Sequence, residues 1–274
     1  MHVSGVSKKV FPFLKFLKNI PLSTIFPLYD KFHIDVRILD GQFLQPLLMT
    51  QGILYIVSTP IGNLKDITLR ALEVLKEVDY ILSEDTRETA KFLKAYNIEK
   101  SQISYREQNH NKVIDKIVND LKSGQNLALV SDSGTPLISD PGFKLVERVT
   151  VENIIVASIP GPVAAVSALS ISGLPTDKFC FVGFLPRTLS HRRNILASYG
   201  SLEATLIIYE SPFRVVKLLE EILGTLGNRT ISIVSEVTKV NEKARKGAAK
   251  DMLKSYENTR IKGEFVVLIA KEGY

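Results

Sequence analysis

Cysteine is nearly absent from this chain, since Cys180 is the only one among 274 residues. A disulfide framework and a cysteine-rich metal site are therefore excluded. Cys180 lies in the apolar stretch KFCFVGF and is expected to be an ordinary buried thiol. No stretch approaches the roughly 20 unbroken apolar residues of a membrane span, so no membrane partner is predicted.

Histidine is also scarce. The four histidines, His2, His33, His110 and His191, form neither an H-x-x-x-H nor an H-E-x-x-H pair. Because such pairs are typical of zinc sites, no metal site is predicted.

A strong excess of one charge is missing as well. The net charge is +6, and half of it falls in residues 1–48, which hold six Lys or Arg and three Asp or Glu. The remaining chain is only mildly basic, so nucleic-acid binding is permitted but not required. Forty-five per cent apolar residues indicate a globular protein with ample material for a core.

The first 48 residues differ from the rest in composition. Before Asp30 there is no acidic residue, and lysines alternate with phenylalanine and leucine. This pattern resembles a targeting segment or a basic membrane-surface helix, although three prolines interrupt it. Other interpretations are a flexible extension, or translation that begins at Met49. We assign residues 1–51 to an extension without a catalytic role.

From residue 52 onward, short apolar runs alternate with helical patterns. In residues 52–173 the expected strands are apolar throughout, at 53–58, 79–83, 126–131 and 153–158. This alternation predicts an α/β fold around a mainly parallel sheet. Asp66 is the expected N-cap of the first helix. The turn-rich segment SGLPTD suggests a boundary at 173/174, and residues 174–274 have fewer helical patterns, which favours a second α/β domain with a mixed sheet.

Three turn-rich segments follow predicted strands of the first domain, at 58–66, 131–142 and 158–162. Ligands of parallel α/β sheets bind at the carboxyl ends of strands, where these segments would meet. Segment 131–142, SDSGTPLISDPG, carries neither G-x-x-x-x-G-K-[ST] nor G-x-G-x-x-G, and it has no lysine or arginine. It suits a small, polar, partly cationic ligand better than a phosphate. Asp140 is expected to cap the helix that starts at Pro141.

Three further segments leave two interpretations open. In SEDTRET, residues Glu84, Asp85 and Arg87 lie where a strand gives way to a helix. They indicate either helix capping with an ion pair, or an acid/base group with an anchor. The basic segments RTLSHRR at 187–193 and KVNEKARKGAAK at 239–250 are either solvated patches or phosphate contacts.

Several motifs occur in an order that resembles a known family. They are VSTPIGNLKDITLRALEVLK, SEDTR, SDSGTPLISDPG, IPGP, SGLPTDKF, GFLPR, YESPFR and KGEF, which together cover about residues 52–270. The chain resembles the ribosomal RNA small-subunit methyltransferase I family of the tetrapyrrole-methylase superfamily. The resemblance implies a cytoplasmic, two-domain α/β enzyme, usually a homodimer, that binds S-adenosyl-L-methionine between its domains. It also implies 2′-O-methylation of a cytidine in the decoding region of 16S ribosomal RNA, on the small ribosomal subunit or its precursor.

The resemblance also implies the site residues. Glu84, Asp85 and Arg87 become the catalytic candidates, with Glu84 or Asp85 as the base. The implied cofactor-binding residues are Pro60, Gly62, Asp132, Gly134, Thr135, Ser139, Asp140, Pro160, Gly161, Pro162, Tyr209, Ser211, Pro212, Lys262, Gly263 and Glu264.

The chain departs from the family pattern at four positions. Ser58 stands where many relatives have proline, Ser133 where alanine is common, and Asn153 where glycine is frequent. These residues are compatible with the expected loops, since asparagine tolerates a left-handed turn. Phe213 replaces a frequent histidine in YESPHR, which removes one candidate proton acceptor or RNA contact.

Two other functions are compatible with the same motifs. One is a methyltransferase of the same fold and cofactor that acts on a tetrapyrrole or another small molecule. The other is a non-catalytic RNA-binding or ribosome-assembly module, which would not bind S-adenosylmethionine.

Overall fold

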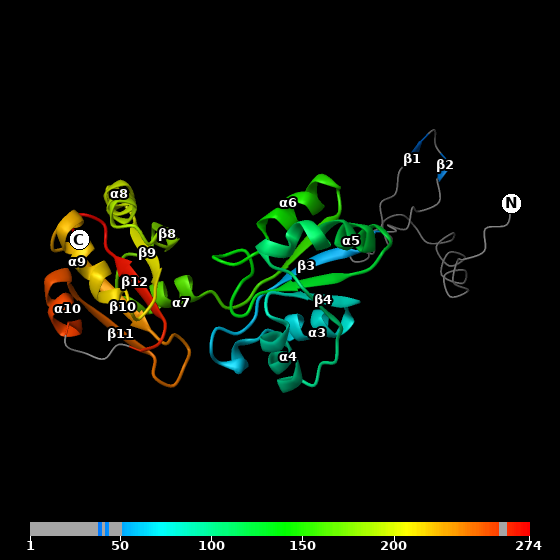
Figure 1. Ribbon diagram of the computed structural model, residues 1–274, viewed down its shortest axis with the longest axis horizontal. Helices are drawn as coiled ribbons and strands as arrows, with labels where there is room; N and C mark the ends of the chain where they lie inside the picture. The colour runs from blue at the N-terminus through cyan, green and yellow to red at the C-terminus, as the bar shows by residue number, and fades with distance from the viewer. Residues whose placement is uncertain (1–37, 40–41, 44–50, 258–261) are drawn as a thin grey trace.

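The computed structural model of this chain describes residues 38–39, 42–43, 51–257 and 262–274. Two α/β units, each built on a five-stranded sheet, follow one another along the long axis of the molecule (Figure 1). Nearly all of the extension expected at residues 1–51 lies outside the described residues; within it, β1 (Ile38–Leu39) pairs antiparallel with β2 (Gln42–Phe43). In the described part of the chain, no helix is both long and apolar enough to cross a bilayer.

The first unit contains a fully parallel sheet in the order β5-β4-β6-β3-β7. Its strands are β3 (Ile53–Val57), β4 (Tyr80–Ser83), β5 (Gln102–Ser104), β6 (Leu127–Val130) and β7 (Ile155–Ile159). The residues of β4 and β6 are all buried, as expected for strands covered on both faces. The predicted parallel sheet is confirmed. The short edge strand β5 was not predicted, because three residues carry too little pattern.

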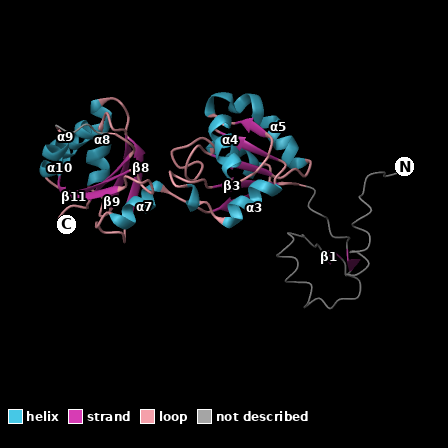
Figure 2. Ribbon diagram, turned by 90° about the horizontal axis from the view of Figure 1, so that it is seen from below, coloured by secondary structure: helices cyan, strands magenta, loops and turns pink. Residues whose placement is uncertain are grey.

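Helices cover both faces of this sheet (Figures 1 and 2). They are α3 (Leu69–Glu77), α4 (Thr86–Ala95), α5 (His110–Lys122) and α6 (Phe143–Val151), with short 3-10 turns η1 (Leu64–Asp66) and η2 (Glu107–Asn109). One core cluster contains Leu75 and Leu93 from α3 and α4, and the other contains Leu121 and Leu145 from α5 and α6. The first unit is therefore a three-layer sandwich.

The first helix begins differently from the prediction. Its N-cap is Thr68, whose hydroxyl accepts a hydrogen bond from the Ala71 N–H at 3.1 Å, and not Asp66. Asp66 ends η1, which Asn63 caps. The expected cap was wrong because residues 64–66 form a turn of their own before α3 starts.

The second unit contains a mixed sheet in the order β11-β10-β12-β9-β8, in which only the β8–β9 pair is parallel. Its strands are β8 (Phe179–Phe184), β9 (Thr205–Glu210), β10 (Thr230–Ser235), β11 (Lys243–Ala248) and β12 (Phe265–Ile269). Its helices are α7 (Ala164–Ile171), α8 (Leu189–Gly200), α9 (Val215–Leu226) and α10 (Ala249–Tyr256). The predicted mixed sheet is confirmed.

Part of the basic segment at 239–250 forms β11, an edge strand whose register pairs Lys243 with Ser235. Lysine and arginine on a sheet edge discourage pairing with other chains. This position at the edge of the sheet explains the basic residues of β11 structurally, and it could not be seen in the sequence.

Helix α7 packs against the second sheet. Its residues Ala168 and Leu169 share a core cluster with Leu174, Ile207 and Leu268. The chain thus crosses from one sheet to the other at 160–163, before α7. A boundary at 173/174 remains a prediction, and the packing of α7 favours one about ten residues earlier.

Candidate active site

Four loops meet at one edge of the first sheet. They follow β4, β6, β3 and β7, which are neighbours in the sheet and all run parallel. Their carboxyl ends therefore lie together, as the sequence pattern predicted for three of these loops.

Hydrogen bonds join three of the loops directly. Thr59 and Gly134 exchange two backbone hydrogen bonds, with N···O distances of 2.8 and 3.1 Å. The Thr135 hydroxyl lies 2.8 Å from the Ser58 hydroxyl and donates to the Pro162 carbonyl at 3.2 Å. Thr135 thus connects the loops that follow β3, β6 and β7.

Two glycines allow this close approach. Gly134 has a φ of +82°, and a Cβ built on Gly161 would lie 2.7 Å from the Ser58 Cβ. Any side chain at Gly161 would push the β3 and β7 loops apart. Pro160, Gly161 and Pro162 line neither cavity of the site, but Gly161 and Pro162 help to hold its loops together.

Replacement of Thr135 by valine should separate the three loops. We expect the free energy of unfolding to fall by about 1–3 kcal/mol, because the Ser58 hydroxyl loses a partner in a half-buried setting. Urea denaturation measures this change. Thr135→Ser retains the hydroxyl and should stay within about 0.5 kcal/mol of the wild type; equal losses in both variants would contradict this role.

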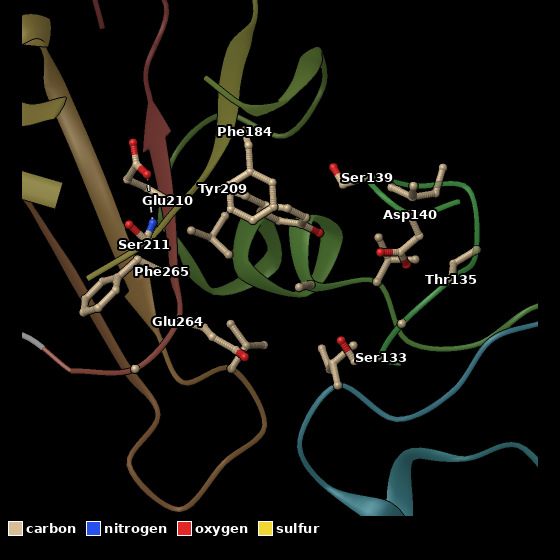
Figure 3. Close-up of a pocket in the computed structure, with 18 of the residues that line it drawn as sticks. Ser133, Thr135, Ser139, Asp140, Phe184, Tyr209, Glu210, Ser211, Glu264 and Phe265 are labelled. Atoms are coloured by element: carbon tan, nitrogen blue, oxygen red, sulfur yellow. Dashed lines mark hydrogen bonds between the residues drawn. The ribbon is translucent and has the colours of Figure 1, made fainter. Parts of the chain in front are cut away.

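A cavity of about 370 Å³ lies between these loops and the second sheet (Figure 3). Ser133, Thr135, Ser139 and Asp140 supply a polar side from the β6 loop. The opposite side is aromatic and apolar. There Phe184 lies edge-on to Tyr209 with ring centroids 5.6 Å apart, and the Tyr209 hydroxyl accepts a hydrogen bond from the Ala165 N–H at 3.0 Å.

More than half of the expected cofactor-binding residues line this cavity: Gly134, Thr135, Ser139, Asp140, Tyr209, Ser211, Pro212, Gly263 and Glu264. They come from both units, which explains why they are so far apart in the sequence. The cavity size falls within the usual range of small-molecule sites, about 300–1,000 Å³.

A second cavity of about 390 Å³ adjoins the first. Of the expected cofactor-binding residues, Pro60, Gly62 and Asp132 line only this one. Ile61, Ser133 and Glu264 line both, so the two cavities share a wall. Gly62 leaves room for the Lys239 side chain, since a Cβ on Gly62 would lie 2.6 Å from the Lys239 Cγ.

The remaining expected residues line neither cavity. Lys262 is exposed. Glu84, Asp85 and Arg87 lie at the end of β4 and the start of α4, beside the second cavity. The Asp85 backbone N–H donates to the Asp132 carboxylate at 3.0 Å, which connects this trio to the cavity wall.

Asp140 does not cap a helix, contrary to the sequence-based expectation. Helix α6 begins at Phe143, its N-cap is Gly142, and no side chain caps it. The Asp140 side chain instead lines the first cavity. Burial, together with the charges of Glu84 and Asp132, raises its pKa to about 6, against the effect of a hydrogen bond with Ser131.

The two catalytic candidates differ in their electrostatics. Burial and the neighbouring Asp132 charge raise the pKa of Glu84. Hydrogen bonds from Arg87 hold the pKa of Asp85 far below its usual range; Arg87 Nη2 lies 2.6 Å from Asp85 Oδ2. Asp85 also caps α4 by accepting from the Arg87 N–H at 2.9 Å. The helix-capping and ion-pair interpretation of SEDTRET is therefore confirmed. The acid/base interpretation stays a prediction, for which the raised pKa favours Glu84 over Asp85 as proton acceptor.

Several lining residues were missed by the sequence analysis, above all Phe184, Phe265, Val163, Ala164 and Val237. Phe184 lies in the motif GFLPR at the end of a predicted strand, so a signal existed for it. Phe265 lies in the motif KGEF, directly after Glu264, so a signal existed for it as well. Val163, Ala164 and Val237 could not be found without knowing how the second sheet faces the first. Among the described residues, no group of three or more His, Cys, Asp or Glu is placed to hold a metal ion.

The two sheets and the cavity between them define a class of protein, the tetrapyrrole methylases. The family model described as "Tetrapyrrole (Corrin/Porphyrin) Methylases" matches residues 53–253. The crystal structure of diphthine synthase superposes with a TM-score of 0.63 at 13% identity, covering 81% of this chain and 90% of that one. Uroporphyrin-III-C-methyltransferase from Thermus thermophilus gives 0.54 at 19% identity, over 80% and 92%. These two structures share the fold.

Relatives with higher sequence identity show which family within this class the chain resembles. The chain is 46% identical to ribosomal RNA small subunit methyltransferase I of Halalkalibacterium halodurans, over 81% of this chain and 77% of the relative. It is 44% identical to the Thermotoga maritima protein of that name, over 80% and 98%. The chain belongs to the ribosomal RNA small subunit methyltransferase I family.

Proposed function

We propose that this protein uses S-adenosylmethionine to methylate the ribose 2′-hydroxyl of a cytidine in the decoding region of 16S ribosomal RNA, on the small subunit or its precursor. The observation that carries the proposal is the pair of adjoining cavities in a chain that is 46% identical to a ribosomal RNA methyltransferase. Two ligands that exchange a group must bind next to each other, with the reacting atoms about 3–3.5 Å apart.

The first cavity suits S-adenosylmethionine chemically. Phe184, Tyr209 and Phe265 offer an aromatic and apolar side for an adenine ring. Asp140 offers negative charge to the sulfonium and ammonium groups, and the turn around Gly134 offers backbone N–H groups to the carboxylate. When bound, this cofactor supplies a methyl carbon that is open to attack by an oxygen.

The chain's own residues then have three tasks. The shared wall, with Ile61 and Ser133, would orient the ribose hydroxyl toward the first cavity. Glu84, whose pKa burial raises, would accept the hydroxyl proton. Arg87 and Arg106 would keep Asp85 ionised and fixed, since both lie within 3.4 Å of its carboxylate.

The proposal is tested by mapping 2′-O-methylation on small-subunit RNA from cells with and without this protein. One cytidine of the decoding region should lose its methyl group when the protein is absent. An unchanged map contradicts the proposal. Methyl transfer to a tetrapyrrole without transfer to the subunit would favour the small-molecule alternative, and no cofactor binding in calorimetry would favour the non-catalytic one.

We further propose that the enzyme is a homodimer and works in the cytoplasm, where the small subunit is present. Sedimentation equilibrium measures the first, and fractionation with the small subunit measures the second. A monomer at working concentration would contradict the dimer.

The pH dependence of cofactor binding should follow Asp140. Its pKa is about 6, so the carboxyl is neutral below pH 5 and ionised above pH 7. Because a cationic ligand favours the ionised form, affinity should rise by about tenfold between these limits, as expected for a charged hydrogen bond. Calorimetry at several pH values measures this. Asp140→Asn should remove the rise; a rise that persists in this variant would contradict the role of Asp140.

A further inference from the structure

Phe213 is the most exposed aromatic side chain among the described residues, at 93%. It lies in the turn between β9 and α9, residues 211–214, which we name the β9–α9 turn. Singly exposed apolar residues are common on protein surfaces, so exposure alone indicates nothing. The frame that holds this turn distinguishes Phe213 from other exposed residues.

The buried carboxylate of Glu210 binds both ends of the β9–α9 turn. Glu210 Oε1 accepts from the Ser211 N–H at 2.8 Å and from Arg214 Nη2 at 2.7 Å. The Arg214 N–H also donates to the Ser211 carbonyl at 3.0 Å. Phe213 is therefore displayed by a turn with little freedom to change shape.

The other oxygen of this carboxylate reaches into the core. Glu210 Oε2 accepts from Arg192 Nη2 at 3.1 Å, and Arg192 Nε donates to Glu221 Oε2 at 2.5 Å. These three side chains are at most 3% exposed. A network of charges that joins α8, β9 and α9 thus anchors the turn, and Arg192 in the basic segment 187–193 is neither solvated nor a phosphate contact.

The same turn forms part of the cofactor cavity. Glu210, Ser211 and Pro212 line the first cavity, whereas Phe213 is not among its lining residues. Phe213 therefore lies at the rim, one residue beyond the wall. Under the proposed function, a nucleotide whose ribose reaches the cofactor would lie beside the first cavity, which the β9–α9 turn borders.

Single-stranded RNA is bound largely by stacking of its bases on aromatic side chains. A rigid, solvent-exposed phenylalanine loses little conformational freedom when a base stacks on it. Arg214, whose side chain is 30% exposed, places a guanidinium that is paired with Glu210 next to the stacking surface. Both features fit a nucleic acid better than an apolar protein partner.

We propose that Phe213 stacks on a nucleobase of the substrate RNA beside the methylated nucleotide, and that the Arg192–Glu210 pair positions it. This inference rests on the proposed function and adds a substrate contact to it. The contact acts on RNA binding and leaves the cofactor cavity unchanged.

The test compares Phe213→Ala with the wild type. The KM for small subunits should rise roughly 5- to 150-fold, which is the loss of one stacked base. The Kd for S-adenosylmethionine, measured by calorimetry, should stay within about twofold, because Phe213 does not line the cavity. Phe213→Trp should retain the wild-type KM.

Phe179 provides a matched control. It is 48% exposed and begins β8, at the opposite end of the same strand from Phe184. Phe179→Ala should leave the KM for small subunits unchanged. An equal rise in both variants would overturn the inference, as would an unchanged KM or a changed oligomeric state in Phe213→Ala. Absence of RNA methylation by the wild type would instead refute the proposed function.

Discussion

Replacement of Arg192 by methionine should lower the free energy of unfolding by about 3–5 kcal/mol, the cost of breaking a buried ion pair by removal of one partner. Glu221 is the residue most affected by this substitution. Its Oε1 already lacks a hydrogen-bond partner, and its Oε2 accepts from Arg192 at 2.5 Å. The substitution would leave a buried carboxylate without a cation. Urea denaturation followed by circular dichroism measures the loss.

The neighbouring residue supplies the control. Arg193 is exposed, so Arg193→Met should change stability by less than about 0.5 kcal/mol. The double variant Arg192→Met with Glu221→Leu removes both charges and should recover much of the lost stability, because well-packed apolar residues replace buried ion pairs at little cost. A double variant as unstable as Arg192→Met would show that the unpaired charge of Glu221 does not cause the effect.

Replacement of Glu84 by glutamine should lower kcat for RNA methylation by about 10²–10⁴-fold, the usual contribution of a general base. The side chain keeps its size but can no longer accept the hydroxyl proton. The Kd for S-adenosylmethionine should change little, since Glu84 does not line the first cavity. Single-turnover kinetics with isolated small subunits measure the chemical step, and calorimetry measures cofactor binding.

Two further variants make this result specific. Glu147→Gln alters an exposed glutamate on α6 and should leave kcat unchanged. Asp85→Asn should slow the reaction less than Glu84→Gln, because Arg87 holds the pKa of Asp85 too low for an efficient proton acceptor. If Asp85→Asn were the slower of the two, the assignment of the base would move from Glu84 to Asp85.

The sequence by itself determined the architecture of the first unit. Continuous apolar strands that alternate with amphipathic helices can bury their surfaces only as a parallel sheet covered on both faces. Parallel strands end at one edge, so the loops at 58–66, 131–142 and 158–162 had to meet there. The hydroxyl, glycine and carboxylate groups of the segment at 131–142 also indicated a polar, partly cationic ligand.

Only the tertiary structure decided which loop residues line the cavities. Gly62 makes room for Lys239 from the connection between β10 and β11, and Asp140 lines a cavity although its sequence context predicts a helix cap. The reason is that a second unit, distant in sequence, supplies the opposite side of the cavity. Short-range patterns carry no information about its orientation.

The environment of each residue in the basic segment at 187–193 was also decided by the tertiary structure. Arg192 and Arg193 are adjacent in sequence, yet the first is buried and the second is exposed. Arg192 lies one helical turn before the buried Leu196, on the side of α8 that packs against α9. Its charge could enter the core only because the fold brings Glu210 and Glu221 within hydrogen-bonding distance, and their positions depend on the packing of β9 and α9 against α8.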